Sequence, residues 1–390
     1  MARKRIVVMG FMGGIPIAGV VWQHLHYIVG LQRLGYEVYY CEDSARMAYN
    51  PETWSYGTDW SYAAKFLDRM ARRFGFEGRW GYCARFEPDQ PTAGLDRTRI
   101  RELIKTADAS LNICGTQEIH EELHGAANLI YVESDPGLEQ VRLDNGDKAP
   151  REYLDRHRAL FTFGENVGTP EFPVPLHGYR WNPTRQPVVT DFWYDASPPP
   201  GDAVFTTIAN WNTSGLKDIA WRGENYLWSK SLEFLRFVDA PQRMEEPVEM
   251  ATNIKAEETR DQLTSHGWRI VDAYPMSDDP DAYVRYIQQS RGEFTVAKDQ
   301  YVRLHTGWFS DRTACYLAAG RPVITQETGF SRHLPTGRGL LTFNTADEIA
   351  EAARTIRADY AAHSRAAYEI AAEYFEATKV VASILERAGI

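Results

Sequence analysis

The alternation of apolar, strand-like runs with helices starts twice in this chain, and it restricts the fold more than any other feature. Arg5 to Phe11 predicts a buried strand, Ala18 to Leu34 a helix, and Tyr36 to Tyr40 a second strand. After prolines accumulate between Pro170 and Gly201, the pattern begins again with a strand at Ala203 to Ile208. Repeated strand–helix units form parallel sheets covered by helices, so we expect an α/β protein with two Rossmann-like domains.

The proline run from Ser197 to Gly201 marks the expected domain boundary. We place the first domain at residues 1–196, a stiff linker at 197–201 and the second domain at 202–365. The apolar face of residues 366–390 predicts a terminal helix, long enough to cross back to the first domain. A chain of 390 residues is too long for one ordinary core, which agrees with two domains.

Composition narrows the class of protein. A hydrophobic content of 44% with 25% charged residues is typical of a soluble globular chain, and the net charge of −10 argues against broad binding to nucleic-acid backbones. The basic start leads into an apolar run of one strand's length, which favours a β-strand over a signal peptide or membrane insertion. The 4 scattered cysteines indicate reduced thiols and a cytoplasmic location. We expect a monomer or homodimer.

A continuous stretch from His305 to Phe330 is the best candidate for a binding site. It predicts a loop that ends at Ser310, a short helix from Thr313 to Ala319, a buried strand that begins at Pro322, and a second loop. In a parallel sheet both loops lie at the same edge, where open α/β sheets bind ligands.

Polar side chains in these two loops indicate a nucleotide. The free N–H groups of the helix that follows Ser310 suit a phosphate, and Glu327 can accept hydrogen bonds from the vicinal hydroxyls of a ribose. The alternative is that Ser310 only caps a helix and that Glu327 is a solvated loop acid. The density of polar residues favours the nucleotide; these residues are His305, Ser310, Asp311, Arg312, Gln326, Glu327 and Thr328.

The residues from Ala318 to Ile324, Ala-Ala-Gly-Arg-Pro-Val-Ile, resemble a turn and strand in the donor-binding domain of the two-domain (GT-B) nucleotide-sugar glycosyltransferases. His305 to Trp308 is similar to the His-Cys-Gly-Trp motif of that family's natural-product branch. The paired glutamates of the large retaining branch would fall near Gly307 and Cys315, and neither residue is acidic. The resemblance implies a GT-B fold and transfer of a sugar from a nucleotide diphosphate to an acceptor in the interdomain cleft.

The resemblance also implies where each substrate binds. The loop from Asn210 to Gly215 follows the first strand of the second domain, where the family's donor domain approaches phosphate. In the first domain, Gly13 and Gly14 allow close backbone approach, and we interpret them as an acceptor-side loop; a purely structural turn is the alternative. Residues 50–95 predict an irregular excursion suited to shaping an acceptor pocket. The predicted donor-binding residues are Trp211, Asn212, His305, Gly307, Ser310, Asp311, Glu327, Thr328 and Gly329.

Charged residues at strand ends are the catalytic candidates. Asp135 follows a predicted strand, and it or the neighbouring Glu133 is positioned to take a proton from the acceptor; for Asp135 the alternative is an Asp-Pro-Gly turn. Lys298 and Arg312 are candidates for stabilising the departing diphosphate, although Lys298 also fits a solvated strand end.

The sequence contains no Asp-x-Asp motif, so we expect catalysis without a metal. No cofactor is implied beyond the nucleotide sugar, which acts as a co-substrate. The expected partners are this nucleotide sugar and a small-molecule or polymer acceptor. The alternatives are a nucleotide-sugar epimerase on the same fold and a nucleotide-sugar binding protein without turnover.

Overall fold

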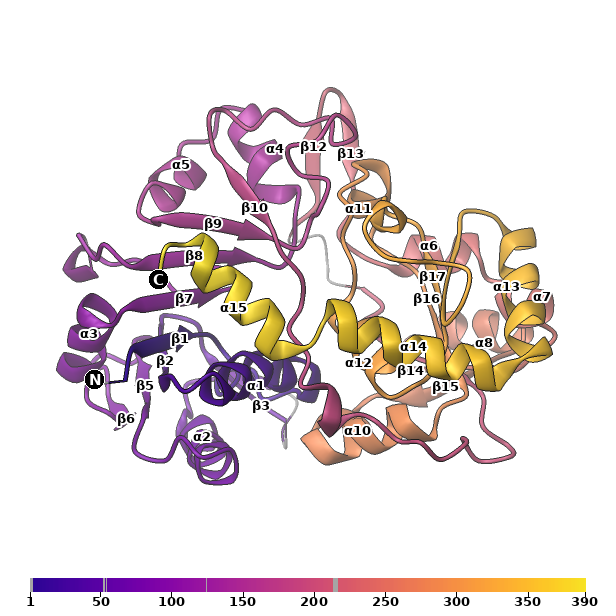
Figure 1. The fold of residues 1–390 in the computed structure, drawn as a ribbon, viewed down its shortest axis with the longest axis horizontal. Helices are drawn as coiled ribbons and strands as arrows, with labels where there is room; N and C mark the ends of the chain where they lie inside the picture. Colours follow the sequence, from indigo (N-terminus) through magenta and orange to yellow (C-terminus); the bar gives the residue numbers. More distant parts are fainter. Residues whose placement is uncertain (1–2, 52, 54, 124, 213–216) are drawn as a thin grey trace.

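The chain forms two α/β domains, each built on its own sheet (Figure 1). The computed structural model describes residues 3–51, 53, 55–123, 125–212 and 217–390. The first sheet has the strand order β10-β9-β8-β7-β1-β2-β5-β6, and the second has the order β15-β14-β11-β16-β17-β18. The predicted linker at residues 197–201 lies between the last strand of the first sheet and the first strand of the second.

The first sheet is parallel except at its β5–β6 edge. Its strands are β1 (Arg5–Met9), β2 (Glu37–Ser44), β5 (Trp80–Ala84), β6 (Thr92–Gly94), β7 (Ala109–Ile113), β8 (Leu129–Glu133), β9 (Ala159–Thr162) and β10 (Trp181–Pro183). The helices of this half are α1 (Ala18–Arg33), α2 (Ser61–Arg73), α3 (Arg97–Thr106), α4 (Leu138–Asp144) and α5 (Ala149–Leu154).

The predicted excursion at residues 50–95 is more regular than its sequence suggested. A small hairpin of β3 (Ala48–Asn50) and β4 (Ser55–Gly57) precedes α2, and β5 and β6 then extend the main sheet. All five residues of β5 are buried, so this strand lacks the alternation of polar and apolar residues that marks a half-exposed strand. Residues 52 and 54 lie outside the described part of the chain.

The second sheet is entirely parallel. Its strands are β11 (Phe205–Ala209), β14 (Val248–Thr252), β15 (Trp268–Asp272), β16 (Gly292–Thr295), β17 (Val323–Gln326) and β18 (Leu340–Phe343), and a separate hairpin consists of β12 (Ile219–Trp221) and β13 (Glu224–Tyr226). The helices are α6 (Ser231–Arg236), α7 (Ala240–Met244), α8 (Glu257–Ser265), α9 (Tyr274–Ser277), α10 (Pro280–Gln289), α11 (Asp299–Arg303), α12 (Asp311–Ala318) and α13 (Ala346–Ala358).

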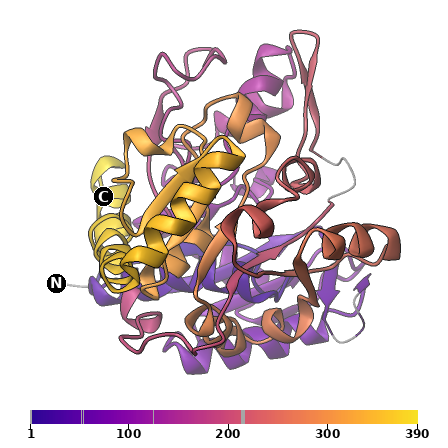
Figure 2. The same cartoon turned by 90° about the vertical axis from the view of Figure 1, so that its right-hand side faces the viewer.

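The last two helices connect the domains, as predicted. α14 (Tyr360–Tyr374) packs on α12 of the second domain, the chain breaks at Phe375, and α15 (Ala377–Arg387) packs on α1 of the first domain. Two backbone hydrogen bonds hold the break: Val188 N–H donates to Phe375 O (2.7 Å) and Ala377 N–H to Val188 O (2.8 Å). Figure 1 shows α15 extending over the first domain, and Figure 2 shows the terminal helices (yellow) along one side of the second.

One hydrophobic core joins the domains, and a second lies within the C-terminal half. The shared core includes buried side chains of α1, α10, α12 and α15, so the two domains pack directly on each other. None of the described helices is long and apolar enough to cross a membrane.

Candidate functional site

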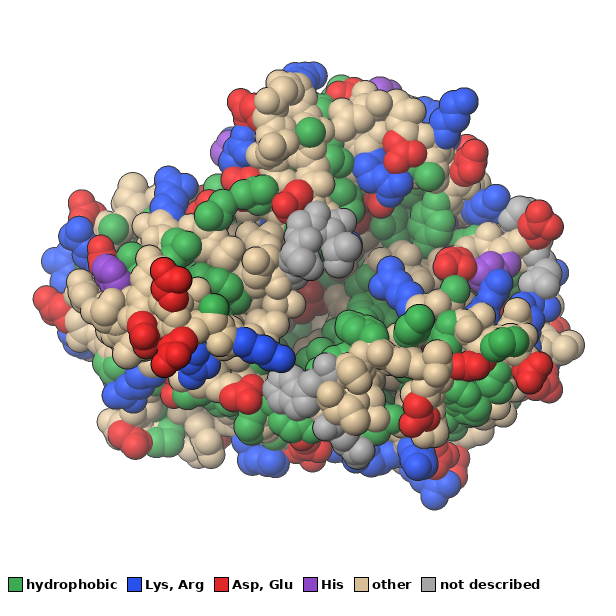
Figure 3. All heavy atoms as spheres, turned by 180° about the vertical axis from the view of Figure 1, so that it is seen from behind, with side chains coloured by type: hydrophobic (Ala, Val, Ile, Leu, Met, Phe, Trp, Pro, Cys, Tyr) green, Lys and Arg blue, Asp and Glu red, His purple; other side chains and the backbone are tan. Residues whose placement is uncertain are grey.

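The site lies where the carboxyl ends of the second sheet's strands face the first domain. The strand order of this sheet reverses direction between β11 and β16, and open α/β sheets bind ligands at such a switch point. Figure 3 shows the molecule hollowed between its two lobes. The residues that follow β16 and precede α12 therefore meet the residues that follow β8.

Two lysines of the second domain converge on one carboxylate of the first. Lys298 Nζ lies 2.9 Å from Asp135 Oδ1, and Lys217 Nζ lies 3.6 Å from Asp135 Oδ2. The Tyr301 hydroxyl also donates a hydrogen bond to Asp135. Both lysines sit over the ring of Trp228, with Nζ atoms 3.1 Å and 4.2 Å from its centre. The predicted Lys298 and Asp135 are thus in direct contact across the cleft.

Lys230 adds a third positive charge beside this pair. It precedes α6 as the N-cap residue, and its Nζ atom lies 5.8 Å from the centre of the Trp308 ring. Trp308 stacks in turn on Tyr301, with ring centres 4.5 Å apart. Among the described residues, no carboxylate lies within 4 Å of the Lys230 ammonium group, and the nearest electrostatic support comes from the more distant Glu293.

Burial and neighbouring charges shift the pKa values of this cluster. Burial lowers the pKa of Lys230 well below its ordinary value, and the nearby Arg312 lowers it further. Burial also lowers the pKa of Lys298, to about 8, although Asp135 opposes this effect. For Asp135, burial raises the pKa, but the charges of Lys298 and Lys217 outweigh burial and hold the pKa well below its usual range. Asp135 is therefore ionised at neutral pH and is a weak proton acceptor.

Sequence reasoning identified Lys298 but missed Lys217 and Lys230. A recognisable signal existed for Lys230, because it stands at the start of the helix that follows the first strand of the second domain, a position suited to anion binding. Lys217 follows residues 213–216, which lie outside the described part of the chain and include half of the predicted Asn210 to Gly215 loop.

Glu133, the second acidic candidate, is held inside the first domain. Its carboxyl group accepts hydrogen bonds from the Thr162 hydroxyl (2.5 Å) and from Gln140 Nε2 (3.1 Å and 3.2 Å). Burial raises its pKa to about 8, so Glu133 carries a proton at neutral pH.

Arg312 lies at the site, but its donors are engaged inside the second domain. Its Nε donates to Glu293 (2.6 Å), a residue with 0% exposure, and its other nitrogens donate to Ile208 O and to Thr295 Oγ1 (2.8 Å). These bonds use three of the five N–H donors of the guanidinium group, so the predicted contact of Arg312 with a diphosphate would depend on the remaining two. This geometry is that of a buried structural ion pair.

Ser310 and Asp311 form the start of α12, next to the first domain. Ser310 occupies the predicted N-cap position, but its side chain makes no capping hydrogen bond. Asp311 is not paired with Arg312; it accepts a hydrogen bond from Gln23 Nε2 of α1 (3.3 Å). Burial raises the pKa of Asp311 to about 7. Both residues line an interdomain cavity of about 310 Å³.

The predicted loops at His305 to Gly307 and at Thr328 to Gly329 contact each other and the first domain. Gly307 N–H donates to Thr328 O (2.8 Å), while Asn166 Nδ2 donates to His305 O (2.9 Å) and to Gly329 O (3.4 Å). At Gly307, with φ of +72°, a Cβ atom would lie 2.8 Å from the backbone nitrogen of Asn166. These residues therefore build a domain contact, and a role in donor binding remains a prediction.

Glu327 accepts hydrogen bonds from backbone N–H groups of its own loop. Its Oε1 accepts from the N–H groups of Thr328 (3.0 Å) and Gly329 (2.6 Å), and its Oε2 accepts from the Thr342 hydroxyl (3.0 Å). The two lone pairs of Oε1 are used by these bonds, whereas Oε2 keeps one, so the predicted ribose contact could be made through Oε2 and remains a prediction.

Trp211 and Asn212 follow β11 and face the second domain. Trp211 stacks on Phe234, with ring centres 6.0 Å apart, and Asn212 Oδ1 accepts from the Ser229 hydroxyl (3.0 Å). Trp211 N–H donates to Asn253 Oδ1 (3.2 Å). These contacts hold the start of the loop against its own domain.

A buried glutamate holds the predicted acceptor-side loop at Gly13 and Gly14. Their N–H groups donate to the two carboxylate oxygens of Glu42 (2.5 Å and 2.9 Å), and the Tyr40 hydroxyl donates to the same carboxylate (2.6 Å). A Cβ atom at Gly13 would lie 2.6 Å from Leu67, so glycine is needed for packing. This part of the loop fits the structural alternative, since an internal carboxylate occupies its donors.

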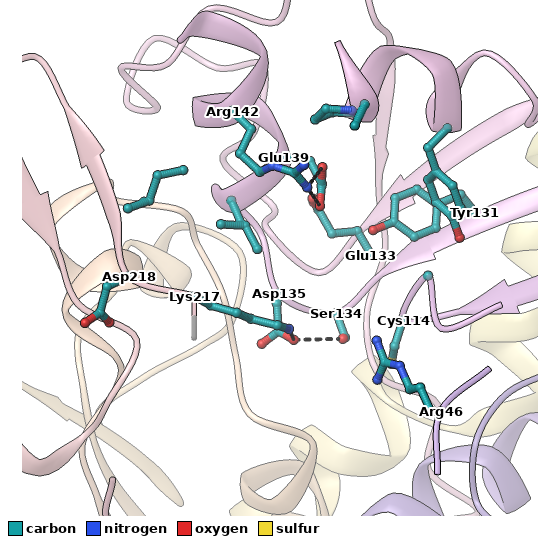
Figure 4. A pocket seen from close by; sticks show the side chains of 16 residues that line it. Arg46, Cys114, Tyr131, Glu133, Ser134, Asp135, Glu139, Arg142, Lys217 and Asp218 are labelled. Carbon is teal, nitrogen blue, oxygen red and sulfur yellow. Dashed lines mark hydrogen bonds and ion pairs between the residues drawn. The ribbon is translucent and has the colours of Figure 1, made fainter. Parts of the chain in front are cut away.

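The largest of the cavities described here adjoins the lysine cluster. It has a volume of about 680 Å³ and lies between α4, α5, the ends of β7 and β8, and the residues that lead into β12. Figure 4 shows Lys217 directed toward Asp135 and Arg142 directed toward Glu139. The cavity is thus lined by charged groups of both signs.

The described residues contain no group of three or more His, Cys, Asp or Glu side chains placed to hold a metal ion. Metal independence was predicted from the absence of a motif, and it remains a prediction.

Several solved structures of other proteins have a similar architecture. No family model and no curated protein matches the sequence. Among solved structures, an alpha-glucosyltransferase in complex with UDP and a 13-mer DNA is similar over 100% of both chains, with a TM-score of 0.60 and 11% identity. AviGT4, a glycosyltransferase involved in avilamycin A biosynthesis, covers 99% of this chain and 97% of its own, with a TM-score of 0.55 and 14% identity.

A sucrose-phosphate synthase from Thermosynechococcus elongatus is similar over 99% of this chain and 98% of its own, with a TM-score of 0.56 and 9% identity. At such identities the likeness concerns the fold. The likeness covers almost the whole chain, and therefore both sheets and the terminal helices described above. The chain therefore has the GT-B fold of the two-domain nucleotide-sugar glycosyltransferases, as its sequence predicted.

Proposed function

We propose that this protein is a metal-independent glycosyltransferase that moves a sugar from a nucleotide diphosphate to an acceptor bound in the interdomain cleft. The observation that supports this function best is the cluster of Lys217, Lys230 and Lys298 at the switch point of the second sheet. One carboxylate, Asp135, contacts this cluster within 4 Å among the described residues. Concentrated and poorly compensated positive charge in a cleft is suited to a dianionic diphosphate.

In this proposal, Lys230 and Lys298 bind the diphosphate and stabilise it as the leaving group. The bond between the anomeric carbon and the diphosphate oxygen breaks, and a bond from the acceptor hydroxyl oxygen to that carbon forms. The hydroxyl proton passes to an oxygen of the departing diphosphate, which therefore serves as the proton acceptor. Negative charge grows on the diphosphate as the bond breaks, so ammonium groups held in place by burial and by the Trp228 ring lower the barrier. The start of α12 adds N–H groups near the same position.

Asp135 acts in this proposal as the counter-ion of Lys298. Its low pKa makes it a poor base, whereas its contact with Lys298 and Tyr301 fixes the ammonium group at the reacting centre. Asp311, with a pKa of about 7 and a position at the start of α12, is suited to a hydrogen bond with a hydroxyl group of the transferred sugar.

Binding and turnover test this function separately. Calorimetry with UDP, GDP, ADP and dTDP measures whether the cleft binds a nucleoside diphosphate, and the labelled sugar of the preferred nucleotide is then followed with and without candidate acceptors. Transfer of the label to an acceptor supports the proposal. An epimerised donor, or binding without any reaction, contradicts it and favours one of the two alternative functions. Absence of nucleotide binding contradicts all three.

A further inference from the structure

The 680 Å³ cavity beside Asp135 has the size and position of a second substrate site. Asp135 and Lys217 line it, so a ligand in this cavity reaches the groups that surround the proposed leaving diphosphate. Most of its wall comes from the first domain, at the ends of β7 and β8 and on helices α4 and α5. The β12–β13 hairpin closes it from the second domain, where Asn145 Nδ2 donates to Ala220 O (2.8 Å).

Charges in the cavity wall are numerous but balanced. Arg46, Arg142 and Lys217 supply the positive charges. The carboxyl groups are those of Glu133, Asp135, Glu139 and Asp218, and Glu133 is protonated at neutral pH because its pKa is about 8. The wall therefore holds as many cations as carboxylates.

Several of these groups are held in place by other protein atoms. Arg142 Nη1 lies 3.2 Å from Glu139, and Arg142 Nη2 lies 2.7 Å from Asp147. Asp218 Oδ1 accepts a hydrogen bond from Trp228 N–H (2.7 Å). The donors and acceptors of the wall are thus oriented before a ligand arrives, which reduces the entropy lost on binding.

This wall discriminates between chemical classes of ligand. Because the charges of the wall balance, a ligand with a net charge gains no net attraction that would offset the loss of its hydration. An apolar ligand would remove water from charged groups without replacing their hydrogen bonds, which is costly. A hydroxyl group both donates and accepts hydrogen bonds. A compound with many hydroxyl groups can therefore satisfy donors and acceptors of both signs.

Tyr131 provides a second, independent observation. Its side chain is 6% exposed and lines the cavity, yet its hydroxyl group has no hydrogen-bond partner among the described residues. By contrast, the hydroxyl of Tyr153, which also lines the cavity, donates to Gln117 O (3.0 Å) and accepts from Asn112 (2.6 Å). Because Tyr131 lines the cavity and its hydroxyl makes no hydrogen bond to another described residue, this hydroxyl is available to a ligand.

We infer that this cavity is the acceptor site and that it takes a neutral saccharide or another uncharged polyol. The inference rests on the proposed transferase function and specifies the substrate class of its second site. The acceptor hydroxyl would approach the anomeric carbon from the side of Asp135, while Tyr131 would contact a neighbouring hydroxyl.

A competition between acceptor classes tests this inference. The labelled nucleotide sugar selected by the donor experiment is incubated with neutral mono- and disaccharides and myo-inositol, with their phosphorylated forms, and with aryl alcohols. We expect label on a neutral saccharide or polyol. Label on phosphorylated sugars or aryl alcohols alone, or donor hydrolysis without label on any neutral polyol, would overturn the inference while leaving donor binding intact. Failure to bind any nucleotide would instead reject the proposed function.

Tyr131→Phe tests whether the acceptor binds in this cavity, because the substitution removes one hydroxyl group from the wall and keeps the ring. We expect the KM for the neutral acceptor to rise about 3- to 10-fold, the usual effect of losing one neutral hydrogen bond, with UDP affinity unchanged. Tyr360→Phe is the matched control, since that hydroxyl donates to Arg291 O (2.7 Å) in the second domain. An unchanged acceptor KM in Tyr131→Phe, or an equal rise in Tyr360→Phe, would place the acceptor elsewhere.

Discussion

Replacement of Lys230 by methionine is the sharpest test of the proposed donor site. Methionine keeps an unbranched side chain of similar length and removes the ammonium group. A hydrogen bond to a charged group contributes about 1.5–3 kcal/mol, so Lys230→Met should weaken UDP binding about 10- to 150-fold. No carboxylate among the described residues contacts Lys230, so no ion pair has to break when a diphosphate binds, but the cost of protonating the buried amine moves the expected effect towards the lower end of this range.

The same substitution should not destabilise the free protein. Burial and Arg312 hold the pKa of Lys230 well below its ordinary value, which means that the fold disfavours the charged form. Removal of this charge should leave the urea midpoint unchanged or raise it. Lower affinity with unreduced stability is a combination that general damage to the fold would not produce.

Calorimetry of UDP binding and urea unfolding provide the two measurements. Lys379→Met is the matched control, because Lys379 is an exposed lysine of α15 that pairs with Glu373 (2.7 Å). UDP affinity equal to wild type in Lys230→Met, or an equal loss in the control, would refute the assignment. Wild-type affinity should also fall as pH rises through about 8, where Lys298 loses its proton, with net proton uptake on binding near that pH.

Three further predictions concern neighbouring charges. Asp135→Asn should lower the pKa of Lys298 below its present value of about 8 and move the alkaline loss of UDP affinity to lower pH. An additional fall in kcat of about 10²–10⁴-fold would identify Asp135 as the base and contradict its role as a counter-ion alone. Arg312→Met should lower the free energy of unfolding in urea by about 3–5 kcal/mol, because it leaves the buried carboxylate of Glu293 unpaired. If UDP binding weakens while stability is unchanged, Arg312 contacts the diphosphate as the sequence predicted. Between pH 4.5 and about 8, the Glu133 carboxyl group is ionised in the unfolded chain but protonated in the folded protein, so the stability of the wild type falls as the pH rises. Glu133→Gln removes this group and should flatten the pH dependence of stability. An equally steep profile in the variant would contradict the raised pKa.

Much of the fold could be predicted because its signals are local. The first strand, helix and strand, the N-cap position of Ser310, the strand after Pro322 and the terminal helix all follow from periodicity, caps and breakers within short windows. β5 and β6 were not recognised, since a fully buried strand such as Trp80–Ala84 carries no alternation.

The candidate site was only partly predictable. Lys298 and Asp135 were each identified from a position at a strand end, but they are 163 residues apart in the chain, and their contact depends on how the domains pack. Lys230 was not identified, because a lysine at a helix start is common on protein surfaces. The motif around His305 was interpreted as a donor contact, whereas its backbone binds Asn166 of the first domain.

The sequence by itself determined the two α/β domains, the GT-B resemblance and the sheet edge at which charged residues gather, because strand and helix periodicity and chain order are local properties. The tertiary structure alone decided which charges meet. Packing between the domains places Lys217 and Lys298 on Asp135. Packing within the second domain pairs Arg312 with Glu293 and leaves Lys230 without a carboxylate within 4 Å among the described residues. The physical reason is that hydrogen bonding, burial and pKa depend on distances between residues far apart in the chain, and these distances are set only when the domains pack together.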